Sequence, residues 1–311
     1  MSTSMAGRHF VNVKDLSPEE LARVLDSAAK VKRQPAEFRQ KLAGKTLAMI
    51  FQKPSLRTRV SFEAGMTQMG GHAIYLAPTD ISLGKRETTE DIAMVLSRMA
   101  DLIMARVFGH DIVEDLAKHS RVPVINGLSD HEHPCQTLAD LQTIIERRGR
   151  LAGQRFVYCG DGNNVAHSLM YGGALTGMHV TIVTPKGYEP NAAVLEESRQ
   201  LGRQSGAEIT VTNDLESGVR GADVIYTDVW ASMGQEAEAE ARKKIFMPYQ
   251  VNARVMSLTK SDCTVLHCLP AHYNEEITYD VTRLPGSAIF DQAENRLHAQ
   301  KALMLHLAGA L

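Results

Sequence analysis

The sequence contains few cysteines, and their spacing offers no metal site. Cys135, Cys159, Cys263 and Cys268 form no Cys-x-x-Cys pair and show no metal-ligand spacing with histidine. A His-Glu-x-x-His motif is absent as well, so nothing in the sequence indicates zinc. Scattered cysteines of this kind are typical of proteins from a reducing compartment. We therefore expect free thiols, no metal ion and a cytoplasmic location.

Long apolar runs and an excess of basic residues are also missing. No apolar run is long enough to span a bilayer, because glycine, proline and charged residues interrupt all of them. Lysine and arginine number 34 against 36 acidic residues, which predicts no broad basic surface. The first seven residues have neither the apolar core of a signal peptide nor the Arg-rich face of a transit peptide. We expect neither a membrane nor a nucleic acid as partner.

The usual signatures of nucleotide binding and of hydrolases are absent or incomplete. The sequence has no Gly-x-x-x-x-Gly-Lys-Ser/Thr loop for ATP and no Gly-x-Ser-x-Gly elbow. Residues 160–165 follow a predicted strand and open a helix, as in dinucleotide-binding proteins, but Val165 replaces the third glycine. No acid follows the next strand. An NAD-dependent dehydrogenase is therefore a minor alternative, and we predict no cofactor. Asn163 and Asn164 are expected either to hold a small polar ligand or to cap the helix.

Strands and helices alternate along the 311 residues, a length that suits two domains. The strands are short and apolar without polar alternation, which favours parallel sheets covered on both faces. We predict strands at Leu47–Phe51, Ala73–Leu76, Leu102–Ala105, Val122–Ile125, Phe156–Cys159, Val180–Val183, Ile209–Thr212, Val224–Thr227 and Thr264–His267. Helices are predicted at Leu56–Met69, Thr88–Met99 (Ile92, Val95, Leu96 and Met99 on one face), Ile112–Lys118, Pro134–Arg148 and Glu294–Ala310. The pattern predicts an α/β protein with two doubly wound parallel-sheet domains, which divide near residue 149.

The segment Ser55–Arg59 lies where the first predicted strand hands over to a helix, with Ser55 as the expected N-cap. A helix N-terminus offers unpaired N–H groups and a positive dipole end, which suit a phosphate group. Two guanidiniums and two hydroxyls add further donors. The segment predicts an anion site, although a plain helix cap with solvated arginines is the alternative.

Four more polar residues have positions of this kind. Arg106, Asp228 and Cys268 each follow a predicted strand, and His133 lies at the start of a predicted helix. In doubly wound sheets, ligands bind at the carboxyl ends of the strands. Each residue alone has an ordinary structural explanation, such as a cap, a turn or a buried thiol. Together they favour a site for an anionic phosphoryl compound and a cationic or zwitterionic partner.

Five segments place the chain beside a known family. In order they are Ser55–Arg59 (SLRTR), His133–Asp140 (HPCQTLAD), Asp228–Gly234, His267–Pro270 (HCLP) and Glu294–Arg296. The chain resembles the aspartate/ornithine carbamoyltransferases along almost its whole length, and the third and fourth segments resemble the ornithine branch. The alternatives are a carbamoyltransferase for another amine (putrescine, N-acetylornithine or aspartate) and an inactive binding protein. The inactive protein would be expected to lack one of the arginines or Asp228.

The resemblance implies a reaction, a domain plan and an assembly. The carbamoyl group of carbamoyl phosphate is transferred to the side-chain amine of L-ornithine, giving L-citrulline and phosphate, as in arginine biosynthesis, without cofactor or metal. Residues 1–148 with the C-terminal helix 292–311 would bind carbamoyl phosphate, and residues 149–291 would bind ornithine. The C-terminal helix would pack back on the first domain. The family's unit is a homotrimer, or a multiple of trimers, with active sites between subunits.

The resemblance also assigns residues to these roles. The carbamoyl-phosphate-binding set is Ser55, Leu56, Arg57, Thr58, Arg106, His133, Gln136, Cys268, Leu269 and Arg296. The ornithine-binding set is Asn164, Asp228, Ser232 and Met233, and the catalytic set is Arg57, Arg106, Asp228, Cys268 and Arg296. The sequence departs from the family at two places: Leu56 stands where threonine is frequent, and Ser82 where a glutamine often reaches the neighbouring subunit.

Overall fold

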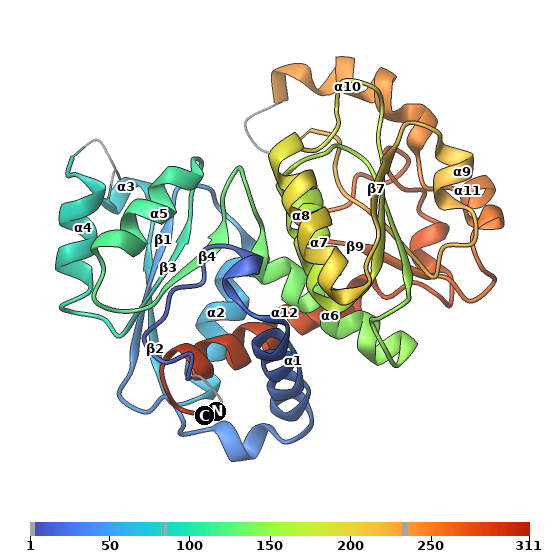
Figure 1. Ribbon diagram of the computed structural model, residues 1–311. Helices are drawn as coiled ribbons and strands as arrows, with labels where there is room; N and C mark the ends of the chain where they lie inside the picture. The colour runs from blue at the N-terminus through green and yellow to red at the C-terminus, as the bar shows by residue number, and fades with distance from the viewer. Residues whose placement is uncertain (1–3, 82, 84–85, 232–235) are drawn as a thin grey trace. The chain divides into compact units, whose positions relative to one another are not determined.

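The computed structural model describes residues 4–81, 83, 86–231 and 236–311 (Figure 1). Contacts within the chain divide it into two compact units. Unit 1 comprises Met1–Gln142 and Glu294–Leu311, and unit 2 comprises Thr143–Ala293. The chain leaves unit 1 inside helix α6 (Pro134–Arg148) and returns inside helix α12 (Ile289–Leu307). The assignment of a substrate to each domain stays a prediction.

Unit 1 is built on a four-stranded parallel sheet. Its strands are β1 (Thr46–Phe51), β2 (His72–Leu76), β3 (Leu102–Arg106) and β4 (Val124–Leu128), in the order β2-β1-β3-β4. The apolar side chains of β1, β3 and β4 are buried, whereas the edge strand β2 is partly exposed. Because β2 and β3 lie on opposite sides of β1, the topology switches direction between β1 and β3. Ligands bind outside the carboxyl ends of strands at such a switch point.

Helices cover this sheet. They are α1 (Pro18–Arg33), α2 (Leu56–Gln68), α3 (Pro78–Ile81), α4 (Thr89–Leu96) and α5 (His110–His119), with short 3-10 turns η1 (Val13–Asp15) and η2 (Pro35–Phe38). Helix α1 begins with a capping box, in which Ser17 and Glu20 bond each other's backbone N–H. One core joins Ile50 and Ile103 of the sheet to Ile92 of α4 and Leu116 of α5.

The helix expected at Thr88–Met99 is shorter than predicted. Thr88 caps it, but α4 ends at Leu96, and the following residues form tight turns. Ile92 is buried, whereas Val95 is 46% exposed and Met99 is 76% exposed. Once the chain leaves the 3.6-residue repeat, Met99 no longer shares the face of Ile92. The prediction of a helix that extends to Met99, with all four residues on one face, was therefore wrong.

The C-terminal helix belongs to unit 1 from Glu294 onward, as predicted. Lys32 Nζ donates to Asn295 Oδ1 at 2.8 Å, and Lys301 Nζ donates to Gln68 Oε1 at 2.6 Å. His306 Nε2 lies 2.9 Å from Ser27 Oγ. Helix α12 begins at Ile289, five residues before the predicted start, and ends at Leu307.

Unit 2 contains a five-stranded parallel sheet in the order β7-β6-β5-β8-β9. The strands are β5 (Arg155–Cys159), β6 (His179–Val183), β7 (Ile209–Thr212), β8 (Val224–Thr227) and β9 (Thr264–His267), and the last three have the predicted bounds. The topology switches direction between β5 and β8. The helical segments are α7 (Asn164–Thr176), α8 (Ala192–Ser205), α9 (Leu215–Val219), η3 (Glu236–Glu238), α10 (Ala239–Phe246), η4 (Met247–Tyr249), α11 (Ala253–Leu258) and η5 (Val281–Arg283).

Both faces of the unit 2 sheet are covered. Helices α7 and α8 pack side by side (Figure 1), and α7 also contacts β6. A second core joins Val157 and Ile225 of the sheet to Val219 of α9 and Val255 of α11. These parallel sheets confirm the predicted fold class. In the described ranges, no helix combines the length and apolarity needed to cross a membrane.

Candidate active site

Helix α2 begins at the carboxyl end of β1, beside the switch point of unit 1. Ser55 is its N-cap, and its Oγ accepts from the N–H of Thr58 at 3.3 Å. The side chain of Leu56 is 74% exposed, so at this position the backbone N–H is the group the helix end offers to a ligand. Arg57, in the first turn of α2, is half-buried. The segment therefore has the geometry of a helix N-terminus open to an anion.

A buried chain of hydrogen bonds runs from this helix into α6 and α12. Arg296 donates from Nη2 to Thr58 Oγ1 at 3.3 Å and from Nη1 to Gln136 Oε1 at 2.8 Å. The Gln136 amide donates in turn to Asp140 Oδ1 at 2.8 Å. All four side chains are nearly inaccessible to solvent. Asp140 thus fixes the orientation of Gln136, a role that sequence reasoning missed although Asp140 follows one helical turn later in the same motif.

His133 brings the remaining predicted residues of unit 1 together. It immediately precedes Pro134 at the start of α6, and Arg106 is the last residue of β3 at the switch point. Burial, and then the guanidiniums of Arg296, Arg106 and Arg57, hold the pKa of His133 well below its ordinary value of 6.5. The imidazole is therefore neutral at physiological pH and acts through hydrogen bonds rather than as a cation.

Acid is expected to destabilise the protein below about pH 6.5. Burial lowers the pKa of His133 and of four other unit 1 histidines: His9, His110, His298 and His306. Below their ordinary value of 6.5, the unfolded chain binds protons that the folded chain does not, so the free energy of unfolding falls with pH. Urea unfolding at about pH 7.5 and about pH 5.5 measures this difference in the free energy of unfolding. Both pH values lie above the range where ordinary carboxyl groups titrate.

His306→Gln provides the control for this prediction. A glutamine can keep the contact with Ser27 but does not titrate, so the dependence on pH should become shallower. Equal stability at the two pH values, or a steeper dependence in His306→Gln, would contradict the assignment.

In unit 2, Asn163 spans the switch point from β5 to β8. Its Oδ1 caps α7 by accepting from the N–H groups of Val165 and Ala166 at 3.0 and 3.3 Å. Its Nδ2 donates to Asp228 Oδ2 at 3.4 Å. Asn164, the predicted ligand-binding residue, is the first residue of α7. Asn163 therefore caps α7 and contacts Asp228. Asn164 follows it directly in the first turn of α7.

Asp228 and Cys268 lie together at the ends of the neighbouring strands β8 and β9. The Cys268 thiol donates to Asp228 Oδ1 at 2.9 Å, and the N–H of Val229 donates to the same oxygen at 2.8 Å. Burial, and then the charges of Asp228 and Asp161, raise the pKa of Tyr158 well above its ordinary value of 10. Its hydroxyl keeps its proton and donates to Asn163 Oδ1 at 3.4 Å. The cluster therefore presents a carboxylate and a thiol side by side.

Some predicted site residues cannot be placed, and one supporting residue was not predicted. Ser232 and Met233, and Ser82 of unit 1, lie outside the described residues. The chain that leads toward Ser232 is anchored by Arg242, which sequence reasoning missed. Arg242 Nη1 donates to the carbonyl of Trp230 at 3.1 Å and to Asp161 Oδ2 at 2.8 Å. This ion pair holds the segment after Asp228 against the loop after β5.

The glycine pattern at residues 160–165 has a packing explanation. A Cβ atom on Gly162 would lie 2.2 Å from the backbone nitrogen of Pro190, and the N–H of Gly162 donates to the carbonyl of Tyr188 at 2.8 Å. The chain's own backbone therefore occupies the space that the missing side chain leaves. A pyrophosphate would need that approach, so the geometry does not favour a dinucleotide.

Asp228, His267 and Cys268 also place three potential metal-ligating atoms within 4.8 Å of one another. Both ring nitrogens of His267 are already engaged, since Nδ1 accepts from the N–H of Leu269 at 2.8 Å and Nε2 lies 3.0 Å from Glu276 Oε1. Imidazole ligates a metal through a free ring nitrogen. A metal at this cluster would therefore have to break one of those two contacts.

Cys268 is expected to be the reactive thiol of the protein. All four cysteines are free, and only Cys268 is partly accessible. Burial raises the pKa of the Cys135 thiol to about 12 and that of Cys263 to about 11, and it raises the pKa of Cys159 further. A colorimetric thiol reagent should modify one thiol per native chain rapidly. The fast phase should disappear in Cys268→Ser and persist in Cys263→Ser, and the reverse result would contradict the assignment.

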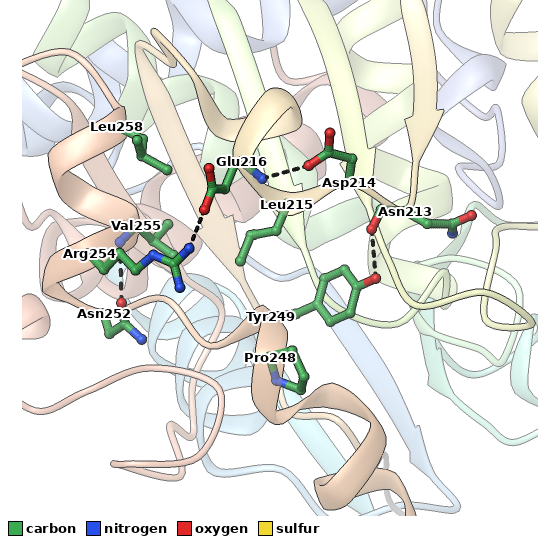
Figure 2. A pocket seen from close by; sticks show the side chains of 10 residues that line it. All are labelled: Asn213, Asp214, Leu215, Glu216, Pro248, Tyr249, Asn252, Arg254, Val255 and Leu258. Carbon is green, nitrogen blue, oxygen red and sulfur yellow. Dashed lines mark hydrogen bonds and ion pairs between the residues drawn. The ribbon is translucent and has the colours of Figure 1, made fainter.

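A separate pocket lies in unit 2 and contains none of the predicted site residues (Figure 2). It has a volume of about 380 Å³ between the turn after β7 and helix α11. Its polar groups are already paired: Arg254 with Glu216, and the Tyr249 hydroxyl with the carbonyl of Asn213 at 2.7 Å. Asp214 and Asn252 cap α9 and α11. The pocket therefore offers a ligand no converging set of unused polar groups.

Comparisons with known proteins match both parts of the chain. Residues 8–146 match the family model "Aspartate/ornithine carbamoyltransferase, carbamoyl-P binding domain", and residues 152–307 match "Aspartate/ornithine carbamoyltransferase, Asp/Orn binding domain". The chain is 54% identical to an ornithine carbamoyltransferase of Thermococcus kodakarensis over 313 aligned positions, covering 100% of this chain and 99% of the relative. An anabolic ornithine carbamoyltransferase of Pyrococcus furiosus is 53% identical, with the same coverage. A solved structure of ornithine carbamoyltransferase from Pyrococcus furiosus has a TM-score of 0.96 at 52% identity and covers 100% of both chains.

Proposed function

Because the chain belongs to the aspartate/ornithine carbamoyltransferase family, we propose that it transfers the carbamoyl group of carbamoyl phosphate to the side-chain amine of L-ornithine. The products are L-citrulline and phosphate. One observation supports the proposal: the start of α2 and Arg106 lie at the switch point of the unit 1 sheet, and Asn164 and Asp228 lie at that of the unit 2 sheet, where doubly wound folds bind ligands. The relatives at 54% and 53% identity are ornithine carbamoyltransferases, which supports ornithine as the acceptor.

Unit 1 supplies the binding site for carbamoyl phosphate in this proposal. The phosphate group lies on the N-terminus of α2 and accepts from the N–H groups that begin with Leu56, and from Ser55, Arg57 and Thr58. Arg106, His133 and Gln136 contact the carbamoyl group. The support is the buried chain from Thr58 through Arg296 to Gln136, which fixes the donors before a ligand arrives. Preorganised donors cost no rearrangement when charge develops on the substrate.

Unit 2 supplies the binding site for ornithine through Asn164 and Asp228, together with Ser232 and Met233. Asp228 aims the side-chain amine by charge and hydrogen bonding. Cys268 and Leu269 are the unit 2 residues proposed to contact the reacting carbamoyl group. The 2.9 Å contact between the Cys268 thiol and Asp228 supports this assignment, because the two groups lie side by side at the carboxyl ends of β8 and β9.

The reaction then needs no covalent enzyme intermediate. An alkylamine has a pKa of about 10.4, so the ornithine amine must lose a proton before it attacks. Desolvation and the positive charges of Arg57, Arg106 and Arg296 disfavour its protonated form. The amine nitrogen forms a bond to the carbamoyl carbon, and the tetrahedral oxyanion accepts hydrogen bonds from Arg106, Thr58 and His133. The bond to the phosphate oxygen then breaks, and phosphate accepts the proton.

Direction, assembly and location form the finer part of the proposal. The anabolic relative from Pyrococcus furiosus supports a role in arginine biosynthesis. The homotrimer, or a multiple of trimers, fits the large apolar side chains that unit 1 leaves exposed on α2, β2 and α4. Light scattering should give a mass that is a multiple of three chains. The four free thiols fit the cytoplasm.

A steady-state colorimetric assay for the ureido group tests the proposed function, because carbamoylation of any of the amines compared forms this group. Purified protein is incubated with carbamoyl phosphate and one of four acceptors: L-ornithine, putrescine, N-acetylornithine or aspartate. We expect turnover with L-ornithine to exceed that with each other amine by at least about tenfold. A site that hydrogen-bonds the polar groups of one acceptor leaves its own groups unpaired when a different acceptor binds. Faster turnover with putrescine or N-acetylornithine would establish the alternative, a carbamoyltransferase acting on another amine.

A further inference from the structure

Two buried titratable side chains beside the proposed site have no role in it. His267 is the last residue of β9, and Glu276 follows nine residues later in the chain. Both side chains are completely inaccessible to solvent, and His267 Nε2 lies 3.0 Å from Glu276 Oε1. A buried pair of this kind is weak evidence for stability on its own, because desolvation offsets the attraction. Because His267 directly precedes Cys268 in the chain, the pair is placed to hold the backbone at Cys268.

The hydrogen bonds around His267 identify which nitrogen carries the proton. Nδ1 accepts from the backbone N–H of Leu269 at 2.8 Å, so that nitrogen presents its lone pair. Nε2 therefore carries the hydrogen and donates it to Glu276. The Glu276 carboxylate keeps the hydrogen on Nε2, so Nδ1 remains free to accept the hydrogen bond from Leu269.

The same carboxylate oxygen holds a second point of the chain. Glu276 Oε1 also accepts from the backbone N–H of His272 at 2.6 Å. One atom therefore ties together the residues that flank the loop of residues 268–271. The loop cannot shift as a whole without breaking a contact of a fully buried acceptor, which is costly.

This loop carries Cys268 and Leu269, the two proposed substrate-contacting residues that follow β9. Cys268 donates its thiol hydrogen to Asp228 at 2.9 Å. Leu269 has a φ of +58°, a left-handed conformation that residues with a Cβ atom seldom adopt. Such a conformation persists only where its surroundings hold it. The N–H of Leu269 is held by His267 Nδ1, so the imidazole acts directly on the unusual backbone.

We propose that Glu276 and His267 form a positioning pair for the proposed carbamoyl transfer. Glu276 keeps the proton of His267 on Nε2, and Nδ1 then holds Leu269 in its left-handed conformation, with Cys268 against Asp228. Neither residue touches substrate. The inference rests on the proposed function, since Cys268 and Leu269 contact reacting atoms only in that reaction.

Two substitutions at position 267 separate the two sides of the ring. In His267→Asn, the side-chain oxygen takes the place of Nδ1 and can still accept from Leu269, but the contact with Glu276 is lost. In His267→Gln, the amide N–H takes the place of Nε2 and can still donate to Glu276, but the acceptor for Leu269 is lost. Each variant loses one buried hydrogen bond, and thermal unfolding measures what each loss costs in stability.

Steady-state kinetics per folded chain, together with thermal unfolding, distinguish positioning from a structural role. We expect kcat of His267→Gln to fall about 10²-fold, the size of effect that follows a displacement of about 1 Å at a reacting group. The kcat of His267→Asn should remain at least about tenfold higher than that of His267→Gln. A purely structural pair would change stability alone, and kcat per folded chain would then be equal in the two variants. Equal kcat values would therefore overturn the proposal.

A measurement on the unmodified protein covers the case in which a variant does not fold. Nitrogen NMR of histidine-labelled protein should show His267 as the Nε2–H form, with Nδ1 unprotonated, at about pH 7.5. A hydrogen on Nδ1, or on both nitrogens, would overturn the pairing. This arm does not depend on activity. If the parent makes no citrulline from L-ornithine, the proposed function fails by that assay, while the NMR result still decides the arrangement of the pair.

Discussion

Arg57→Ala is expected to lower kcat/KM for carbamoyl phosphate by about 10²–10³-fold while leaving the fold intact. The guanidinium lies in the first turn of α2 and is half-buried, and it is one of three arginines that lower the pKa of His133. Its removal takes a positive charge from the position where the phosphate would lie, and where charge grows as the bond to the carbamoyl group breaks. Citrulline formation over a range of carbamoyl phosphate concentrations measures the loss.

Arg59→Ala is the matched control for this variant. Arg59 is the second guanidinium of the Ser55–Arg59 segment, but it is exposed and already engaged, since it pairs with Glu63 at 3.0 Å and lies 4.0 Å from the ring centroid of Tyr75. An exposed pair of this type contributes little to stability. We expect Arg59→Ala to keep activity near the parent value. Near-normal turnover of Arg57→Ala, or an equal loss in both variants, would show that the anion does not bind at the start of α2.

Asp228→Ala is expected to lower kcat/KM for L-ornithine by a similar factor, about 10²–10³. The carboxylate is almost buried at the end of β8 and accepts from Cys268 and from the backbone of Val229. Without it, a cationic or amine-bearing acceptor has no carboxylate to aim it, and the Cys268 thiol loses its acceptor. The KM for carbamoyl phosphate should change much less, because the residues proposed to bind its phosphate belong to unit 1.

Two companion variants test which property of Asp228 matters. Asp228→Asn keeps the shape and one acceptor oxygen, so a loss as large as that of Asp228→Ala would assign the effect to charge. Asp214→Asn changes another acid of unit 2, one that caps α9 and lines the separate pocket, and should leave turnover unchanged. Parent-like activity of Asp228→Ala on ornithine would remove the acceptor assignment.

The sequence predicted most elements well because local signals were strong. Short apolar runs located the nine strands of the described residues, and the cap at Ser55 located the start of α2. The failures occurred where periodicity continued past the real end of a helix. Ile92, Val95 and Met99 keep helical spacing, yet a tight turn after Leu96 leaves Met99 exposed, because backbone hydrogen bonding and not spacing decides where a helix stops.

The candidate site was predicted in part. Ser55, Thr58, Gln136 and Arg296 were chosen from separate segments, and the structure joins them in one chain of hydrogen bonds. The supporting acids Asp140 and Glu276, and the anchoring Arg242, carry no local signal of their own. A buried acid looks like a surface acid in a sequence, because its partner is distant along the chain or its burial depends on packing.

By itself, the sequence determined which segments become parallel strands, which residue types follow them, and that no element forms the motifs of ATP or zinc sites. These are properties of a few neighbouring residues, so short-range chemistry is enough to specify them. Only the tertiary structure decided the strand orders β2-β1-β3-β4 and β7-β6-β5-β8-β9. Those orders set Arg106 beside the end of β1 and Asp228 beside both Asn163 and Cys268. Which strands become neighbours depends on packing between segments far apart in the chain, and no local pattern records it.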